Sequence, residues 1–158
     1  MWITRVELDN IKSYGKRTSI DLAQGVNAIC GRNGAGKSTV LEAIGLALFG
    51  KSGYKNQEQF IHEKAKKGEI TITLFDSRDE RLYQVVRPIK GGAPYVFDPE
   101  TKRQLATGVE DVQQWLRDCI RVEPTTDLKA LFENAIGVAQ GLLTVSFLET
   151  EANRRKVE

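Results

Sequence analysis

A glycine-rich loop at residues 31–38 constrains the fold of this chain more than any other feature. It reads Gly31-Arg-Asn-Gly-Ala-Gly-Lys-Ser38 and matches the pattern G-x-x-x-x-G-K-[ST] at every fixed position. A mostly apolar run at residues 26–30 precedes the loop and predicts a strand buried on both faces. Residues 38–49 have the apolar spacing of a helix, and Gly50 is placed to end it. Strand, loop and helix in this order predict a phosphate-binding loop.

The residues of this loop suit a nucleoside triphosphate and its metal ion. Glycines allow the backbone to fold into a nest whose amides face one anion. A helix that begins near Lys37 points the positive end of its dipole at the same anion. Lys37 is a point charge for the β- and γ-phosphates, and the Ser38 hydroxyl is a hard oxygen ligand for Mg²⁺. We therefore expect ATP and Mg²⁺ to bind at this loop.

The rest of the chain alternates between antiparallel strands and helices. Two alternating segments near the N-terminus, residues 2–10 and 17–22, predict a ribbon of paired strands. The middle third predicts an antiparallel meander, with strands within residues 68–82, 81–87, 95–97 and 104–106. A capping box at Thr107 and Glu110 opens one helix, a second helix covers residues 127–135, and a short strand follows at residues 136–138. The expected fold class is α/β, a P-loop unit with an antiparallel β subdomain.

Hydrolysis of ATP requires a second acid for Mg²⁺ at the end of an apolar strand, and a group that positions water. Residues 72–76 imitate such a strand and end in Asp76, but their alternation indicates a half-exposed antiparallel strand. A serine follows the aspartate where a hydrolytic site would want a carboxylate, so we interpret Asp76 as a turn residue. The sequence contains no other candidate and no Leu-Ser-Gly-Gly segment. We expect another chain or deleted sequence to supply the hydrolytic half.

Composition and charge narrow the remaining possibilities. The formal net charge of +2 is too small to indicate nucleic-acid binding by itself. No window approaches 18 uninterrupted apolar residues, and the N-terminus does not read as a signal peptide. We therefore expect no membrane association and a cytoplasmic or nucleoid location, nuclear in a eukaryote. Cys30 and Cys119 lack metal-ligand spacing, and we expect both to be buried, reduced thiols.

Several segments together resemble the start of an SMC-type ATPase. They are Val6-Glu-Leu-Asp-Asn-Ile-Lys-Ser-Tyr14, Gly31-Arg-Asn-Gly-Ala-Gly-Lys-Ser-Thr39, Leu41-Glu-Ala-Ile44 and Ala47-Leu-Phe-Gly50. Gln140-Gly141, followed by Phe147-Leu-Glu149 and Arg154-Arg155, resembles the glutamine loop and the entry to a coiled coil. The set is most similar to the Rad-fifty/SbcC branch, the ABC-type ATPases of DNA double-strand-break repair. The P-loop occurs in many families, whereas its combination with Lys12-Ser13 and Gln140-Gly141 is specific.

The resemblance implies a split ATPase head. Residues 1–158 would be the N-terminal half of that head, with residues 150–158 beginning the coiled-coil helix. The C-terminal half of the same head would carry the signature motif and the missing acids. Two such heads would form a homodimer around two ATP molecules, clamp double-stranded DNA and regulate an SbcD-type nuclease.

The resemblance also implies roles for individual residues. Lys37 and Gln140 would be catalytic, and Ser38 and Gln140 would hold Mg²⁺, with Gln140 also reaching the attacking water. The nucleotide-binding residues would be Lys12, Ser13, Asn33, Gly34, Ala35, Gly36, Lys37, Ser38, Thr39, Ile61, His62 and Glu63. Of these, residues 61–63 would line the base and sugar. Lys12 stands where the family usually has arginine, so its phosphate contact would lack the bidentate fork.

Two other functions are compatible with the same residues. One is a chromosome-structuring SMC head of the condensin or cohesin type, which would share the chemistry but have a different partner. The other is a nucleotide-binding module that never hydrolyses ATP. A nuclease-binding site at the base of a coiled coil would separate the first from a repair ATPase, and ATP turnover would separate the second.

Overall fold

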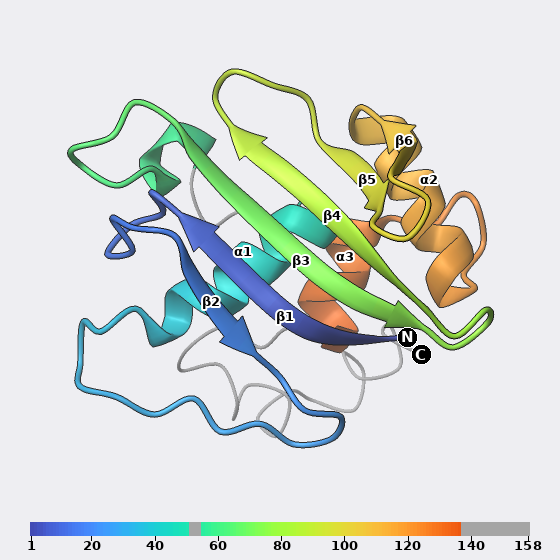
Figure 1. Ribbon diagram of the computed structural model, residues 1–158, viewed down its shortest axis with the longest axis horizontal. Helices are drawn as coiled ribbons and strands as arrows, with labels where there is room; N and C mark the ends of the chain where they lie inside the picture. The colour runs from blue at the N-terminus through green and yellow to red at the C-terminus, as the bar shows by residue number, and fades with distance from the viewer. Residues whose placement is uncertain (51–54, 137–158) are drawn as a thin grey trace, which may run out of the picture.

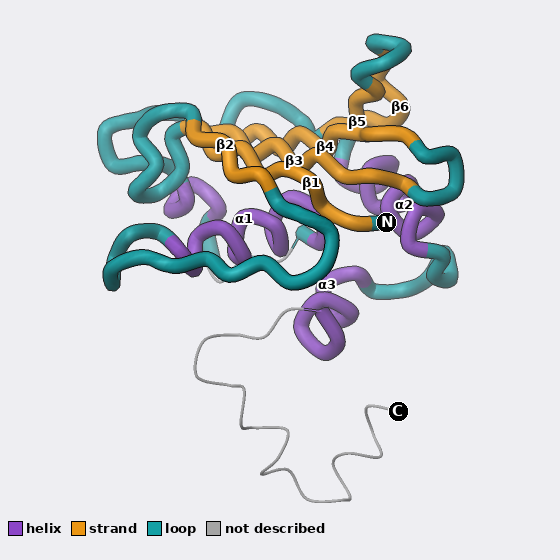
Figure 2. Tube along the Cα trace, turned by 60° about the horizontal axis from the view of Figure 1, so that its bottom comes forward, coloured by secondary structure: helices purple, strands orange, loops and turns teal. Residues whose placement is uncertain are grey.

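The computed structural model describes residues 1–50 and 55–136. In that part of the chain, six strands form one sheet in the order β2-β1-β3-β4-β5-β6, and each neighbouring pair is antiparallel. The strands are β1 (Trp2–Asp9), β2 (Thr18–Asp21), β3 (Gly68–Asp76), β4 (Arg81–Ile89), β5 (Tyr95–Asp98) and β6 (Arg103–Thr107). The helices are α1 (Lys37–Phe49), the 3₁₀ turn η1 (Gln57–Phe60), α2 (Val109–Ile120), α3 (Leu128–Leu131) and the π turn η2 (Phe132–Ile136). Figures 1 and 2 show α1, α2 and α3 on one face of the sheet.

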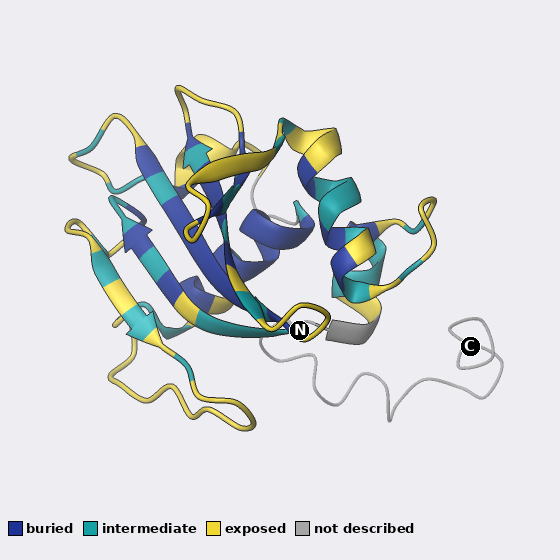
Figure 3. Cartoon of the chain, turned by 45° about the vertical axis from the view of Figure 1, so that its right-hand side comes forward, coloured by how far each residue is buried: buried dark blue, intermediate teal, exposed yellow. Residues whose placement is uncertain are grey.

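The core lies between that face of the sheet and α1. Alternate residues of the central strands point inward, and Leu8, Ile70 and Ile72 have no exposed surface. Nine of the 13 residues of α1 are buried, so this helix is apolar around most of its circumference. Figure 3 shows α1 and the central strands as the most deeply buried elements. The helix that follows the glycine-rich loop is therefore anchored in the core.

A second layer holds α1 from the side away from the sheet. The ring of Phe132 stacks on Phe49, with centroids 5.0 Å apart. It also covers Gly45, where a Cβ would lie 2.7 Å from the Phe132 Cε1 atom. A side chain at position 45 would therefore displace the ring, and glycine allows the π turn to pack directly on the α1 backbone.

The structure confirms the expected ribbon, meander and first helix. β1 and β2 pair antiparallel, and β3 to β6 form the meander. α1 ends at Gly50, which adopts a left-handed conformation with φ of 65° and donates back to the helix, as its sequence position predicts. The second helix is confirmed as α3 and η2 with Asp127 as its N-cap.

The strand expected at residues 26–30 is wrong. These residues form no regular element, and Val26 is fully exposed. An apolar strand covered on both faces needs neighbours on both sides, and β2 is the last strand at that edge of the described sheet. The same correction applies to Cys30, which is exposed, whereas Cys119 is buried as expected.

Two smaller expectations also change. The capping box is wrong because α2 begins after Gly108 without a side-chain cap, and the Thr107 hydroxyl bonds to Gln104 instead. The strand expected at residues 136–138 is wrong at its first residue, because Ile136 belongs to η2. Residues 137–138 and the coiled-coil start at residues 150–158 lie outside the described residues.

Candidate nucleotide-binding site

The glycine-rich loop closes around the side chain of Lys37, the first residue of α1. The Lys37 ammonium donates to the carbonyl oxygens of Gly31 at 2.7 Å and Arg32 at 2.8 Å. The Ala35 amide donates to the Arg32 carbonyl at 3.1 Å, which tightens the same turn. These bonds hold the cationic group in the mouth of the loop, where it can meet an anion.

The start of α1 is suited to hold negative charge. Gly36 is its N-cap, with φ of 89°, and Gly34 also has a positive φ of 78°. No acidic residue lies in the first turn of α1 and no side chain caps it, so its first amides and its dipole are not neutralised locally. Ser38 is exposed there and accessible to a ligand, whereas Thr39 is 5% exposed and packs into the helix.

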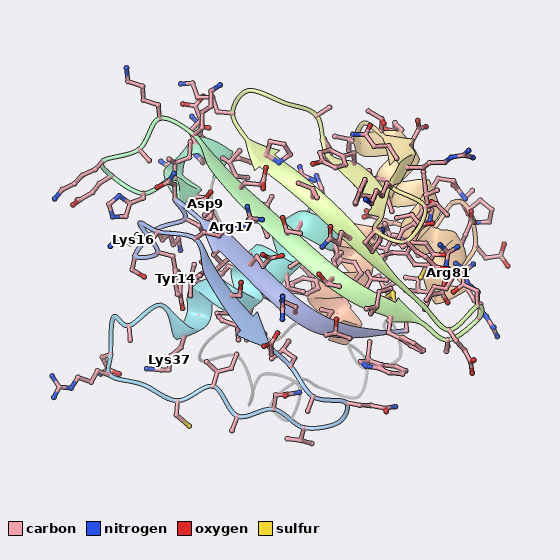
Figure 4. All side chains as sticks on the ribbon, in the orientation of Figure 1. Asp9, Tyr14, Lys16, Arg17, Lys37 and Arg81 are labelled. Atoms are coloured by element: carbon pink, nitrogen blue, oxygen red, sulfur yellow. The ribbon has the colours of Figure 1, made fainter. Side chains whose placement is uncertain are left out.

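The turn that follows β1 lies directly on the last glycine of the loop. Backbone bonds between Ile11 and Tyr14, of 3.0 Å and 2.7 Å, close this turn. A Cβ at Gly36 would lie 2.7 Å from both the Ser13 Oγ and the Tyr14 Cε2 atoms. The Tyr14 hydroxyl donates to the Gly36 carbonyl at 3.1 Å. Figure 4 shows Tyr14 and Lys37 at the same end of the molecule. Ser13, predicted to bind phosphate, is therefore beside the start of α1.

Lys12 reaches along the side of α1. Its ammonium pairs with the Glu42 carboxylate of that helix, four residues beyond Ser38, and lies 4.8 Å from the centre of the Phe60 ring. The Lys12 backbone has a φ of 46°, and its amide donates to the Phe60 carbonyl at 2.9 Å. The structure thus places the Lys12 charge against the helix that carries the loop, where it pairs with Glu42.

Ile61, His62 and Glu63 line an open hollow together with Glu58, Ala65, Lys66 and Lys90. This segment is tied to the turn after β1. The His62 amide donates to the Asn10 carbonyl at 2.8 Å, and Ile61 forms a backbone bridge with Ile11. The His62 ring covers Gly15, where a Cβ would lie 2.9 Å from the Nε2 atom. The predicted base-lining segment and the predicted phosphate loop therefore meet the same short turn from two sides.

Asp76 is unsuited to the role of a metal-binding acid in this site. It is 1% exposed at the end of β3, where it pairs with Arg81 in the strand register. Figure 4 shows Arg81 at the opposite end of the sheet from Lys37. The Arg78 guanidinium, which donates to Asp76 at 2.7 Å, holds the pKa of this carboxyl at about 2. The Cys119 thiol also contacts Asp76, at 3.3 Å, and burial raises the pKa of that thiol to about 12. Asp76 is the last residue of β3 and accepts a hydrogen bond from the Arg78 amide at 2.9 Å, so it holds the turn that follows, as expected. The half-exposed strand expected at residues 72–76 is wrong, because Ile72, Leu74 and Asp76 are all buried.

The remaining metal ligand predicted from the sequence, Gln140, lies outside the described residues. Within the described residues, no group of three or more His, Cys, Asp or Glu side chains gathers where it could hold a metal ion. Among the described residues, Ser38 is the predicted metal ligand, and its hydroxyl is a hard oxygen of the kind that Mg²⁺ prefers.

Sequence reasoning missed two residues of this site. Tyr14 lies within the segment at residues 6–14, but nothing in the sequence shows which side chain of that turn contacts Gly36. Glu42 could have been found from its spacing, because it is four residues after Ser38 and therefore one turn along the same helix.

Comparison with known proteins places this site in a family. Residues 5–140 match the profile of the AAA domain family. The chain belongs to this family of AAA domains. The match includes the turn after β1, the glycine-rich loop and the segment at residues 61–63, so every described site residue lies inside the domain.

Several curated relatives of this AAA domain are named as DNA double-strand break repair ATPases. The chain is 28% identical to the DNA double-strand break repair Rad50 ATPase of Thermococcus kodakarensis, over 99% of this chain and 17% of that protein. It is 30% identical to the Rad50 ATPase of Methanopyrus kandleri, over 98% of this chain and 18% of that protein. It is 36% identical to exonuclease subunit 2 of Enterobacteria phage T4, over 61% of this chain and 17% of that protein. The chain spans less than a fifth of the length of these relatives.

Solved structures share the fold of this AAA domain. A chain from a study of ATP-driven dimerization and DNA-stimulated activation of SMC ATPases has a TM-score of 0.72 and 21% identity, covering 99% of this chain and 97% of that one. The recombination mediator RecF with ATP has a TM-score of 0.53 and 24% identity, covering 66% of this chain and 27% of that one. The resemblance to the SMC and Rad-fifty/SbcC heads and the P-loop ABC-type α/β fold class are confirmed.

None of the helices in the described part of the AAA domain has both the length and the apolar character needed to cross a membrane.

Proposed function

We propose that this AAA domain binds the phosphates of ATP as the N-terminal half of a DNA double-strand-break repair ATPase head. One observation carries the proposal: the glycine-rich loop closes around the Lys37 ammonium at the N-terminus of a buried helix. A fixed cation, left-handed glycines and uncapped amides then converge on one place, which is what a triphosphate requires.

The surrounding residues would divide the nucleotide between them. Lys37, with the backbone of residues 33–39, would hold the β- and γ-phosphates, and Ser38 would ligate Mg²⁺. Lys12 and Ser13 lie beside the same glycine-rich loop and would contact the phosphates from the side. Ile61, His62 and Glu63 would line the base and sugar, because their hollow adjoins the turn that rests on the loop. Gln140 would reach the metal and the attacking water.

Hydrolysis of ATP would require the C-terminal half of the head. The P-loop supplies positioning and charge, but in-line attack by water also needs acids that hold the metal and orient the water. Asp76, the candidate acid in the sequence, is bonded to Arg78 at the other end of the sheet. We expect this half alone to bind ATP with little turnover and the completed head to be an ATPase.

The names of the curated relatives support a role in DNA repair for the complete protein. Proteins named as double-strand-break repair ATPases match nearly the whole chain, which favours a repair ATPase over a chromosome-structuring SMC protein. We propose that ATP joins two heads into a homodimer, which clamps double-stranded DNA and regulates an SbcD-type nuclease. ATP would drive this step by binding the joined state better than ADP does. Such a protein would act in the cytoplasm at the nucleoid, or in a nucleus.

The direct test is ATP affinity measured by isothermal titration calorimetry with Mg²⁺ present. Lys37→Ala should abolish measurable ATP binding, because it removes the cation at the centre of the loop. Arg103→Ala is the matched control, since it removes one positive charge from the exposed edge strand β6. Wild-type affinity in the Lys37→Ala protein would show that the site is placed wrongly.

A further inference from the structure

The Tyr14 side chain makes a contact with the glycine-rich loop that no assigned role explains. Its hydroxyl donates to the Gly36 carbonyl at 3.1 Å, and its ring edge lies where a Cβ at Gly36 would come within 2.7 Å. The tyrosine is held in place by its own backbone, which exchanges two hydrogen bonds with Ile11. The contact therefore joins a fixed side chain to the one peptide group that links the loop to α1.

The orientation of that peptide group decides where the next amide points. A peptide unit is planar and trans, so the Gly36 carbonyl and the Lys37 N–H point in opposite directions. Gly36, with φ of 89°, is the N-cap of α1, so its carbonyl also accepts the first hydrogen bond of the helix. The Tyr14 hydroxyl is a second donor to the same oxygen, and the two hydrogen bonds together restrict rotation of this peptide. They thereby keep the Lys37 amide directed outward from the N-terminus of α1, with the other amides that the helix leaves unpaired.

We propose that Tyr14 is a positioning residue for phosphate binding, which orients the Gly36–Lys37 peptide so that the Lys37 amide faces the triphosphate. The proposal rests on the proposed function, since it assumes that phosphates occupy the loop. It also gives the turn after β1 a mechanical role. The turn is bonded to Phe60 and His62 on one side and to Gly36 on the other. It therefore sets the spacing between the phosphate loop and the segment at residues 61–63.

The test compares Tyr14→Phe, which removes one hydroxyl and keeps the ring, with Tyr95→Phe on β5 as the matched control. Affinities for ATP and for inorganic triphosphate are measured by calorimetry on the full chain. A neutral hydrogen bond corresponds to a factor of about three to ten in affinity, with fivefold as the central expectation. Tyr14→Phe should weaken the binding of ATP and of inorganic triphosphate by the same factor, because the hydroxyl acts on the phosphate-binding loop. Tyr95→Phe should change neither of these two affinities.

A spectroscopic readout separates positioning from a general loss of stability. In ¹⁵N-labelled protein, the Lys37 amide proton should shift downfield when triphosphate binds, and Tyr14→Phe should reduce that shift. An unchanged affinity and amide shift in Tyr14→Phe would overturn the inference. Weaker binding of ATP with unchanged binding of inorganic triphosphate would also overturn it, because that pattern would place Tyr14 beside the nucleotide base. If Lys37→Ala binds ATP normally, the proposed function fails. If Lys37→Ala fails to bind while Tyr14→Phe behaves as wild type, only the present inference fails.

Discussion

Replacing Gly36 with alanine should weaken ATP binding strongly. Two separate costs arise at this position. Alanine at φ of 89° occupies a left-handed conformation, which costs roughly 1–2 kcal/mol for an L-residue. Its Cβ would also stand 2.7 Å from Tyr14 and from Ser13, so the turn after β1 has to move and the Tyr14 hydrogen bond, worth about 1 kcal/mol, is lost.

These costs should appear in affinity more than in folding. Residues 31–35 are exposed, so the loop can relax away from the turn without disturbing the core. Nucleotide binding requires the wild-type conformation of the loop, so the Gly36→Ala protein meets both costs when it binds ATP. A total of about 2–3 kcal/mol corresponds to roughly a 30- to 150-fold loss of ATP affinity. Titration calorimetry with Mg²⁺ measures the affinity, and urea unfolding measures the stability of the same samples.

Gly108→Ala is the matched control. Gly108 is also a helix N-cap with φ of 93°, but a Cβ there would meet nothing within 4 Å. It should alter stability through α2 and leave ATP affinity within about twofold. Equal effects of the two substitutions on ATP affinity, or a Gly36→Ala protein that binds ATP like wild type, would refute the reasoning.

Three further substitutions test other contacts. Glu42→Gln should free the Lys12 ammonium to approach the phosphates and should therefore tighten ATP binding about two- to fivefold at low salt. High salt should remove this gain, and calorimetry at two salt concentrations measures both affinities. Weaker ATP binding by the Glu42→Gln protein would contradict the prediction. Gly45→Ala should lower the free energy of unfolding by about 1 kcal/mol, because crowding against Phe132 outweighs the gain in helix propensity. Urea unfolding measures this change, and a Gly45→Ala protein more stable than wild type would disprove the prediction. Asp76 has a folded-state pKa lowered from 3.8 to about 2, so its ionisation contributes about 2 kcal/mol of stability, complete above about pH 5 and lost as the pH falls from about 4 to about 2. Asp76→Asn should therefore be less stable than wild type at neutral pH, and this difference should shrink in acid; a constant difference would count against the ion pair.

The sequence predicted those elements whose signals are local. α1 could be placed because Gly36 and Gly50 both adopt the left-handed conformations that only glycine takes easily. The meander could be placed because its strands alternate and turn clusters separate them. The segment at residues 26–30 could not, because an apolar run reports a preference for burial and says nothing of whether a partner strand is present.

The site was predicted unevenly for the same reason. Lys37 and Ser38 follow from a contiguous pattern whose chemistry is understood. Tyr14 and Glu42 act through contacts between separate segments of the chain, and sequence spacing alone does not reveal which of several nearby residues makes such a contact. The expected capping box failed because Gly108 could begin the helix one residue later, which left the Thr107 hydroxyl to bond elsewhere.

The central claim is that this chain grips ATP while a second half completes the catalytic site. The most direct measurement is steady-state release of phosphate from ATP and Mg²⁺ by the chain alone, by a co-expressed C-terminal half alone, and by the two together. The account predicts that only the pair turns ATP over and that Lys37→Ala abolishes this activity. A pair that binds ATP and Mg²⁺ but releases no phosphate, or turnover by this chain alone at the rate of the pair, would contradict it.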